Sequence, residues 1–251
     1  ELPIVTRIEN RQEYQEQKRQ LNIETITQIT AENLENEESV SEDKVDEDWT
    51  TRFFNYAQDI SNEEMQELWG RILAGEVKQP KSYSLRTLEL LRNLSKDDAE
   101  VFIKLSQFAF HTVTDDFLVK GKNKILDKFN IRYSEIALLQ EIGLLHTGEM
   151  VSYNFMPTTK AIRTPVTIGD TIILLERKEN SPKQSVSVIL FTCIGRELLK
   201  LVTINPDFKY IQWFAKELKS DMTNLKYGRI IKTHKDYIEH TQPLIEIPDI
   251  E

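Results

Sequence analysis

The feature that most constrains the fold is the block of residues 48–110, in which apolar side chains recur at helical spacing. Residues 49–60 place their apolar positions on one face of a helix, and residues 65–73 follow the i, i+3, i+4, i+7, i+8 pattern. The residues on the two faces are Trp49, Phe53, Tyr56, Ala57, Ile60, Met65, Leu68, Trp69, Ile72 and Leu73. Each face needs a partner to bury it, so we predict a helical domain over residues 48–113.

Polar residues mark where these helices begin. Ser61–Asn62–Glu63–Glu64 has the capping-box pattern, in which the Ser61 hydroxyl accepts a hydrogen bond from the Glu64 amide and the Glu64 carboxylate accepts one from the Ser61 amide. Ser84 is expected to cap the next helix, and Ser95–Lys96–Asp97–Asp98 starts a further one that runs to Phe110. The paired aspartates are explained by the positive end of the helix dipole, so they require no catalytic role.

The leading segment, residues 1–47, is predicted to be a helical arm followed by an acidic linker. Residues 4–21 favour a helix in which Tyr14 is the only apolar side chain between Glu9 and Gln20, and residues 23–34 favour a second short helix. A helix that is polar all round is typical of an assembly or of a bridge through solvent, although the arm lacks the sustained heptads of a strong coiled coil. We expect self-association, or binding of a protein partner, through residues 1–35.

The net charge of −9 lies in this leading segment. Residues 1–48 hold 14 of the 41 acidic and 5 of the 32 basic residues, which leaves 27 of each in the remainder. An acidic arm repels phosphate, so nucleic acid is an improbable partner for it. No apolar run approaches the roughly 18 residues of a membrane-spanning helix, so no transmembrane segment is expected.

The character of the sequence changes after about residue 114. Helical patterns at residues 123–131 and 134–142 precede β-rich runs at residues 166–175 and 186–191, and a helix returns at residues 197–202. This order is typical of a winged-helix-like domain, which we predict for residues 114–251. A further amphipathic helix is expected at residues 208–218, and a strand at residues 227–234. The predicted fold class is therefore mainly α with a smaller α+β part.

Residues 48–110 resemble an uncharacterised bacterial family, number 2806 in the domain-of-unknown-function series. The resemblance rests on Asp48–Trp49, Phe53–Phe54, Ser61–Trp69, Ile72–Glu76, Ser84–Leu88 and Leu94–Glu100, with further similar segments at Asn22–Ile26 and Phe191–Leu198. The positions of Trp69, Leu73–Ala74, Leu94–Ser95 and Asp98–Ala99 are more faintly similar to the alpha-type abortive-infection proteins of bacteria, which are associated with defence against phage. The first resemblance implies no active site. Its shared residues are packing and helix-start residues, and an anchoring role for Trp49 and Trp69 is the alternative.

The sequence offers no motif for catalysis, cofactor binding or metal binding. Its eight glycines form neither a P-loop nor a dinucleotide-binding turn, and His111, His146, His234 and His240 lack the spacing of a shared metal site. We therefore assign no catalytic residue, cofactor or metal. Cys193, the one cysteine, follows an apolar run and is expected to be a packed, inert thiol, which favours a reducing cytoplasmic location.

A basic patch is the strongest candidate for contact with nucleic acid or another anion. It comprises Lys120, Lys122, Lys124, Lys128 and Arg132. The helix that would read DNA in a winged helix, residues 134–142, carries Glu135 and Glu141 and no basic residue, which suits protein contacts better than a major groove.

Three functional hypotheses follow from the sequence. The first is a non-enzymatic interaction or regulatory protein, a component of bacterial anti-phage defence, with Tyr14, Trp49 and Trp69 as partner anchors. The second is a DNA-binding regulator that uses the winged helix. The third is a hydrolase or nuclease with an unrecognised site, which requires polar residues that converge in a pocket.

Overall fold

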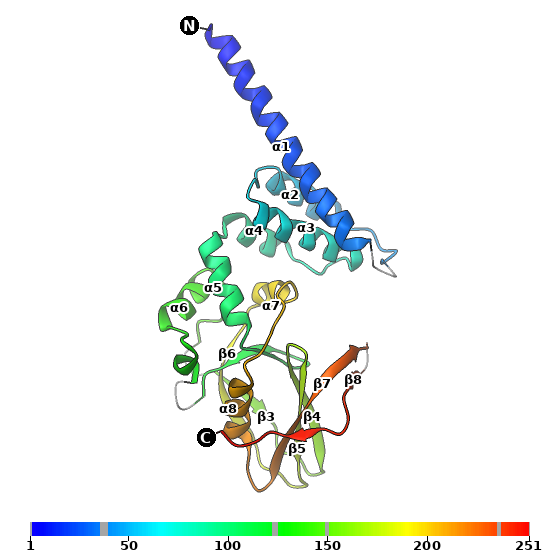
Figure 1. Ribbon diagram of the computed structural model, residues 1–251, viewed down its shortest axis with the longest axis vertical. Coiled ribbons are helices and arrows are strands. Elements are labelled where there is room, and N and C mark those ends of the chain that lie inside the picture. The colour runs from blue at the N-terminus through cyan, green and yellow to red at the C-terminus, as the bar shows by residue number, and fades with distance from the viewer. Residues whose placement is uncertain (1, 36–39, 122–124, 149–150, 235–236, 251) are drawn as a thin grey trace. The chain divides into compact units, whose positions relative to one another are not determined.

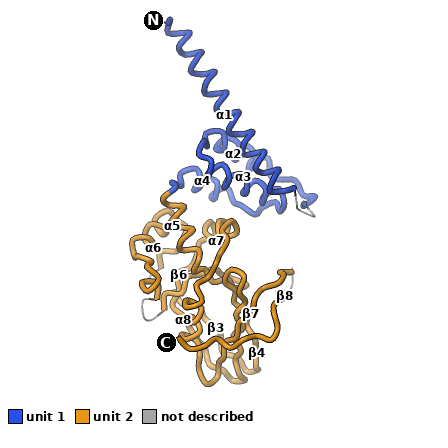
Figure 2. The backbone as a smooth tube through the Cα atoms, viewed as in Figure 1, with its two compact units in different colours: residues 1–96 blue, residues 97–251 orange. Residues whose placement is uncertain are grey.

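The computed structural model describes residues 2–35, 40–121, 125–148, 151–234 and 237–250 (Figure 1). The chain forms two compact units, residues 1–96 and residues 97–251 (Figure 2). Within the described residues, the first unit is helical and the second combines helices with a nine-stranded sheet.

The first unit contains α1 (Ile4–Leu34), α2 (Glu47–Ala57), α3 (Glu63–Lys78) and α4 (Leu85–Asn93). The side chains of Asp46, Asn62 and Ser84 cap α2, α3 and α4 by accepting hydrogen bonds from backbone amides. The predicted cap at Ser61 is therefore wrong by one residue. The Ser61 hydroxyl instead accepts a hydrogen bond from the Asn22 side chain of α1, at 3.1 Å.

Aromatic rings form the centre of this unit. Trp49 and Phe53 stack with their ring centroids 5.1 Å apart, and Phe53 packs against Trp69 at 5.2 Å. Phe53 and Trp69 have no exposed surface, and Trp49 is 3% exposed. The apolar faces recognised in residues 49–73 are therefore buried against one another.

The first helix is one continuous element of 31 residues, and not two helices as the sequence suggested. Its second half packs on α3, where Ile26 is fully buried and the Thr30 hydroxyl lies 3.2 Å from the Gly70 carbonyl oxygen. Gly70 has no side chain, and a Cβ atom there would overlap the side chain of Ile29. None of the described helices is both long enough and apolar enough to cross a membrane. Helix α1 has the length, but it is largely polar.

The second unit is built on a curved antiparallel sheet. Its strands are β1 (Ala109–His111), β2 (Asp116–Val119), β3 (Ser152–Phe155), β4 (Ile162–Ile168), β5 (Thr171–Arg177), β6 (Gln184–Leu190), β7 (Thr223–Thr233), β8 (Ile238–His240) and β9 (Ile245–Glu246). They pair in the order β3-β6-β2-β1-β4-β5-β7-β8, and β9 pairs with β7. The helices are α5 (Lys96–Ser106), η1 (Ile125–Phe129, a 3-10 helix), α6 (Tyr133–Glu141), α7 (Cys193–Leu199) and α8 (Phe208–Leu218).

The sheet curls around α8. This helix contacts both β6 and β7, although four strands separate β6 from β7 in the sheet. Phe214 of α8 packs on Phe110 of β1 with ring centroids 4.4 Å apart. The Tyr210 hydroxyl accepts a hydrogen bond from the Val119 amide at 2.6 Å, and complete burial raises the pKa of Tyr210. The core of the unit therefore lies between α8 and the concave side of the sheet.

The predicted fold class, mainly α with a winged-helix-like domain, is wrong for this part of the chain. The fold is α+β, and its large antiparallel sheet replaces the small wing. The β-rich run of residues 166–175 is a hairpin that turns at Gly169, whose φ of 54° suits a residue without a side chain. The expected helix at residues 208–218 is present with the same bounds.

Candidate functional site

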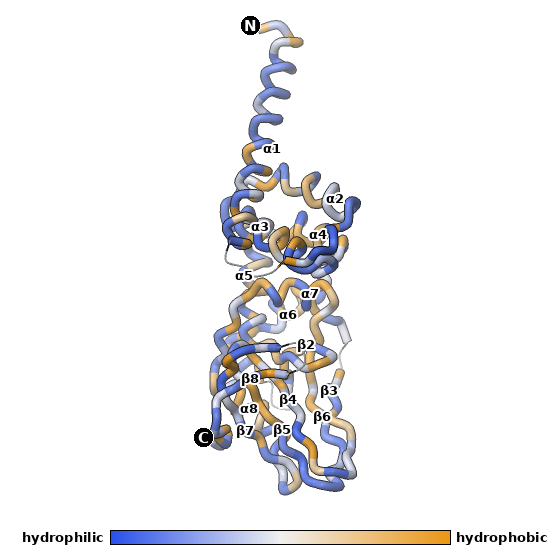
Figure 3. Tube along the Cα trace, turned by 90° about the vertical axis from the view of Figure 1, so that its right-hand side faces the viewer, coloured by the Kyte–Doolittle hydropathy of each residue, from blue (hydrophilic) through white to orange (hydrophobic). Residues whose placement is uncertain are grey.

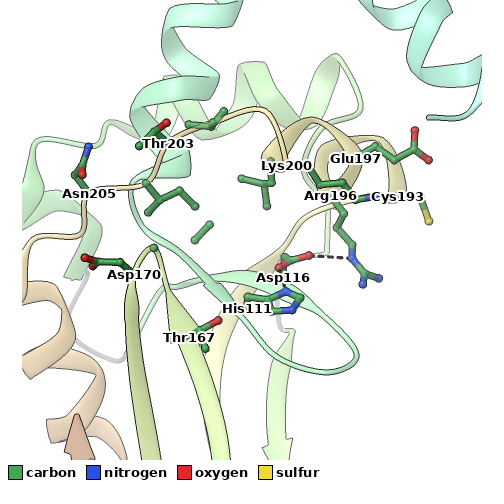
Figure 4. A pocket seen from close by; sticks show the side chains of 15 residues that line it. His111, Asp116, Thr167, Asp170, Cys193, Arg196, Glu197, Lys200, Thr203 and Asn205 are labelled. Atoms are coloured by element: carbon green, nitrogen blue, oxygen red, sulfur yellow. Dashed lines mark hydrogen bonds and ion pairs between the residues drawn. The ribbon is translucent and has the colours of Figure 1, made fainter. Parts of the chain in front are cut away.

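A cleft of about 840 Å³, with both polar and apolar side chains in its lining, lies within the second unit. The end of β1, the turn between β4 and β5, helix α7 and residues 202–205 surround it (Figure 4). Its polar side chains are His111, Asp116, Thr167, Asp170, Cys193, Arg196, Glu197, Lys200, Thr203 and Asn205. The cleft is the best candidate for a ligand site because polar groups converge there from distant parts of the sequence.

Local hydrogen bonds fix the walls of the cleft. The Thr112 amide donates to the Asp115 carbonyl oxygen at 2.9 Å, which closes the β1–β2 hairpin and sets His111 opposite Asp116. The Thr192 hydroxyl caps α7 by accepting a hydrogen bond from the Gly195 amide at 3.1 Å. This cap anchors the start of the helix that carries Arg196.

Asp116 contacts two other side chains of the cleft, those of His111 and Arg196. It is 8% exposed, and its Oδ1 atom lies 2.6 Å from Nδ1 of His111. Arg196 donates from Nε to its Oδ2 atom at 3.0 Å (Figure 4). Both oxygens of the carboxylate are therefore satisfied although Asp116 is buried.

This pairing defines the chemistry that His111 offers. An ionised carboxylate only accepts hydrogen bonds, so Nδ1 of His111 carries the proton that points at Asp116. In the neutral imidazole Nε2 is then an acceptor, and the His111 side chain is 60% exposed. A histidine oriented in this way can take a proton from a ligand hydroxyl or from water.

Cys193 differs from its expected state. The sequence predicted a packed thiol at the end of an apolar strand, but β6 ends at Leu190 and Cys193 is the exposed first residue of α7. Within the described residues no hydrogen bond links it to His111, and in Figure 4 the Arg196 side chain lies between the two. The cleft therefore contains a thiol and an imidazole without the contact that activates a cysteine nucleophile.

Three residues of the predicted basic patch lie in the described part of the chain. Lys120 follows β2, Lys128 lies in η1, and Arg132 precedes α6, and all three are exposed. The Lys128 ammonium lies 4.8 Å from the ring centroid of Trp213. Lys122 and Lys124 lie outside the described residues.

Helix α6, the predicted DNA-recognition helix, uses polar side chains for contacts within its own unit. Glu135 of α6 lies 2.7 Å from the Lys104 ammonium and accepts a hydrogen bond from the Arg132 amide at 2.7 Å. Burial acts to raise the pKa of Glu135, but these hydrogen bonds outweigh it and lower the pKa. Gln140, the one side chain suited to a base edge, donates to the His146 carbonyl oxygen.

The three predicted partner anchors lie in different environments. Tyr14 is 68% exposed on the first half of α1, whereas Trp49 and Trp69 are core residues of the first unit. The Trp49 indole nitrogen donates to the Tyr83 carbonyl oxygen at 2.8 Å, so its polar atom is also engaged inside the fold. Among the described residues, no group of three His, Cys, Asp or Glu side chains is placed to hold a metal ion.

A family model described as protein of unknown function, DUF2806, matches residues 6–215. The chain belongs to this family. The DUF2806 match runs from α1 into α8 and includes every residue that lines the cleft. No curated protein and no solved structure matches the chain. The similarity to abortive-infection proteins stays a prediction, because the match is to DUF2806 alone.

Sequence reasoning did not find the central pair of the cleft. No role was predicted for Asp116, and Arg196 was included only in the similar segment Phe191–Leu198. These two residues are 80 positions apart, and the β2–β6 pairing that brings their elements together is a non-local contact. No local spacing signals such a site.

Proposed function

We propose that the protein is a non-enzymatic interaction protein that pairs with a second copy of itself through the first half of α1. The observation that carries this proposal is the exposure of that half. Apart from Thr6, all residues from Leu2 to Lys18 are exposed, whereas the second half of the same helix packs on α3. Figure 3 shows the first half as largely hydrophilic, with hydrophobic residues near its N-terminal end. We call residues 4–18 the free half of α1.

A heptad numbering can be assigned along both halves of α1, and four of its eight a and d positions are apolar. Its a and d positions are Val5, Ile8, Gln12, Gln15, Arg19, Asn22, Ile26 and Ile29. Asn22 and Ile26 are buried in the first unit, while Val5 is 61% and Ile8 is 41% exposed. The free half therefore continues a face that already forms a helix–helix contact. Its two glutamine layers weaken such a pair but specify its register.

One pair of charges beside this face favours a second copy in a parallel arrangement. Arg11 and Lys18 occupy g positions, and Glu9 and Glu16 occupy e positions. In a parallel pair each g position faces the e position five residues further on in the other helix, so Arg11 meets Glu16 of the second copy. In the described part of the single chain, Glu16 pairs with the half-buried Arg19 at 3.3 Å, which is a weak surface interaction.

Light scattering on the purified protein over a concentration series tests the proposal. We expect a dimer that Ile8→Lys abolishes, because the substitution places two ammonium groups in one apolar layer. Arg11→Glu is expected to weaken the dimer and the added Glu16→Arg to restore it, whereas Arg7→Glu at an outer c position leaves it unchanged. A wild-type monomer at every concentration, or equal effects of Arg7→Glu and Arg11→Glu, would contradict the proposal.

The setting of this interaction is also proposed from the sequence. A single cysteine suits a reducing cytoplasm, and a role in anti-phage defence rests on the faint abortive-infection similarity of residues 69–99. Loss of protection from phage on Ile8→Lys, in cells that the wild-type gene protects, would support that role. The DNA-binding alternative has lost the winged helix on which it depended.

A second candidate function is hydrolysis in the cleft, favoured by the orientation of His111 through Asp116. In this reaction Nε2 of His111 takes a proton from water, the water oxygen attacks the ester carbon or phosphorus, and the proton passes to the leaving oxygen. We expect any turnover of p-nitrophenyl acetate or p-nitrophenyl phosphate to fall at least about 100-fold in His111→Gln. The exposed His146→Gln is the control. Equal rates in the two variants would rule out His111 as the base.

A further inference from the structure

Arg177, the last residue of β5, is a buried cation without an acidic partner. It is 6% exposed, and within the described residues no carboxylate lies within ion-pair distance of it. Its Nη1 atom donates to the Met156 carbonyl oxygen at 2.6 Å, and the guanidinium carbon lies 6.0 Å from the ring centroid of Phe155. Its Nε atom is buried and has no hydrogen-bond partner.

The neighbouring buried polar groups are satisfied. The Ser181 hydroxyl donates to the Lys178 carbonyl oxygen at 2.7 Å, and the Thr223 hydroxyl donates to Gln184 at 3.0 Å. Burial lowers the pKa of Arg177, since no negative charge compensates for the loss of water. A buried guanidinium without a neighbouring anion is costly, so an anion bound beside Arg177 would stabilise the fold.

Only one nitrogen of this guanidinium is open to a ligand. Nη1 donates to Met156, and neither Nε nor Nη2 has a hydrogen bond to the described part of the chain. Nε is buried, so a dissolved anion does not reach it, whereas Nη2 is not among the buried atoms that lack a partner. Nη2 is therefore the donor that Arg177 can offer to a carboxylate or phosphate oxygen.

Arg177 lines a second cleft of the same unit, with a volume of about 870 Å³. Four basic side chains line it, those of Arg163, Arg177, Lys178 and Lys219, against two acidic ones, Glu176 and Asp221. Glu176 already lies 2.9 Å from Arg163 and 3.0 Å from Lys226. Lys219 likewise lies 2.8 Å from Asp249. Among the lining residues, Arg177 and Lys178 therefore supply the positive charge that these ion pairs leave, in a cleft whose size suits a small molecule.

We infer that this cleft binds a small oxyanion, a carboxylate or phosphate group, through Nη2 of Arg177, with Lys178 at its rim. The site is separate from the His111 cleft and from the free half of α1. It requires neither hydrolysis nor dimer formation.

Thermal unfolding and titration calorimetry with inorganic phosphate and with succinate, at an ionic strength held constant with chloride, test this inference. A saturable rise in the melting temperature is expected with at least one of the two anions, and the anion that gives the rise identifies the ligand group. Arg177→Met is expected to remove the rise, and Lys178→Ala to weaken binding by about tenfold. The exposed Arg229→Met, whose guanidinium pairs with Asp170 outside this cleft, leaves it unchanged.

The melting temperatures of the variants without added anion distinguish a binding role of Arg177 from a structural one. Replacing an uncompensated buried cation with an apolar side chain of similar length is expected to leave the melting temperature unchanged or higher. If Arg177→Met instead lowers the melting temperature and the wild-type protein gains nothing from either anion, Arg177 serves only to tie β5 to Met156 and the inference is overturned. A rise of equal size in the wild type and in both Arg177→Met and Lys178→Ala would also overturn it.

Discussion

Replacement of Trp69 by alanine is expected to lower the free energy of unfolding of the helical unit by about 3–5 kcal/mol. The indole has no exposed surface and packs against Phe53 and Tyr56, with ring centroids 5.2 and 6.5 Å away. Alanine would leave a large cavity that the surrounding helices fill only in part. Urea denaturation followed by far-ultraviolet circular dichroism measures the change.

Phenylalanine substitutions at Trp49 and Trp69 distinguish the contribution of side-chain volume to stability from that of the indole hydrogen bond. The Trp69 indole nitrogen is buried without a hydrogen-bond partner in the described part of the chain, so Trp69→Phe also removes an unsatisfied donor. Trp49→Phe removes the buried hydrogen bond from the indole nitrogen to the Tyr83 carbonyl oxygen. We expect Trp49→Phe to be the more destabilising of the two. A transition that Trp69→Ala barely moves would mean that this ring is exposed and available to a partner.

Replacement of Glu76 by alanine is expected to cost about 2–4 kcal/mol, because it leaves two backbone amides without their acceptor. Glu76 is 2% exposed, and its carboxylate accepts hydrogen bonds from the amides of Lys81, at 2.6 Å, and Tyr83, at 2.9 Å. This carboxylate fixes the connection from α3 to α4, in which Lys81 has a φ of 72°. Tyr83 in turn accepts the hydrogen bond from Trp49, so the loss extends to the aromatic core.

Glu76→Gln is the matched control for this prediction. It preserves the shape of the side chain and one accepting oxygen, but its amide nitrogen cannot accept the second hydrogen bond. We expect a cost between those of the wild type and Glu76→Ala, measured by the same urea denaturation. If Glu76→Gln and Glu76→Ala are both as stable as the wild type, the carboxylate does not stabilise the connection from α3 to α4.

The helical unit was predictable because its signals are local. The faces of α2 and α3 repeat at helical spacing, and the core rings Trp49, Phe53 and Trp69 were all recognised. The same periodicity gave the bounds of α8. The error at Ser61 arose because Asn62 is an equally good cap, and only the contact of Ser61 with Asn22 of α1 decides between them.

The sheet was not predictable in the same way. β1 has three residues, Ala109–His111, and its apolar side chains extend the pattern of the preceding helix, so the sequence assigned them to that helix. The hairpin at Gly169 was interpreted as one extended run. Pairings such as β2 with β6 join residues about 70 positions apart, and short apolar runs carry no information on their partners.

The candidate sites were missed for a related reason. The cleft depends on the contacts of Asp116 with His111 and Arg196, which only the folded sheet assembles. Cys193 was assigned to a strand because the apolar run before it continues to Phe191, whereas the Thr192 cap starts a helix there. The orphaned nitrogen of Arg177 appears only when its neighbours have been placed.

Disulfide trapping at the free half of α1 tests the central claim most directly. In a Cys193→Ser background, Ile8→Cys places a thiol at a d position, where two parallel helices bring equivalent residues together. We predict that mild oxidation yields a covalent dimer from Ile8→Cys and none from Asn10→Cys at an outer f position. Equal trapping at the two positions, or none at position 8, would contradict parallel pairing through this face.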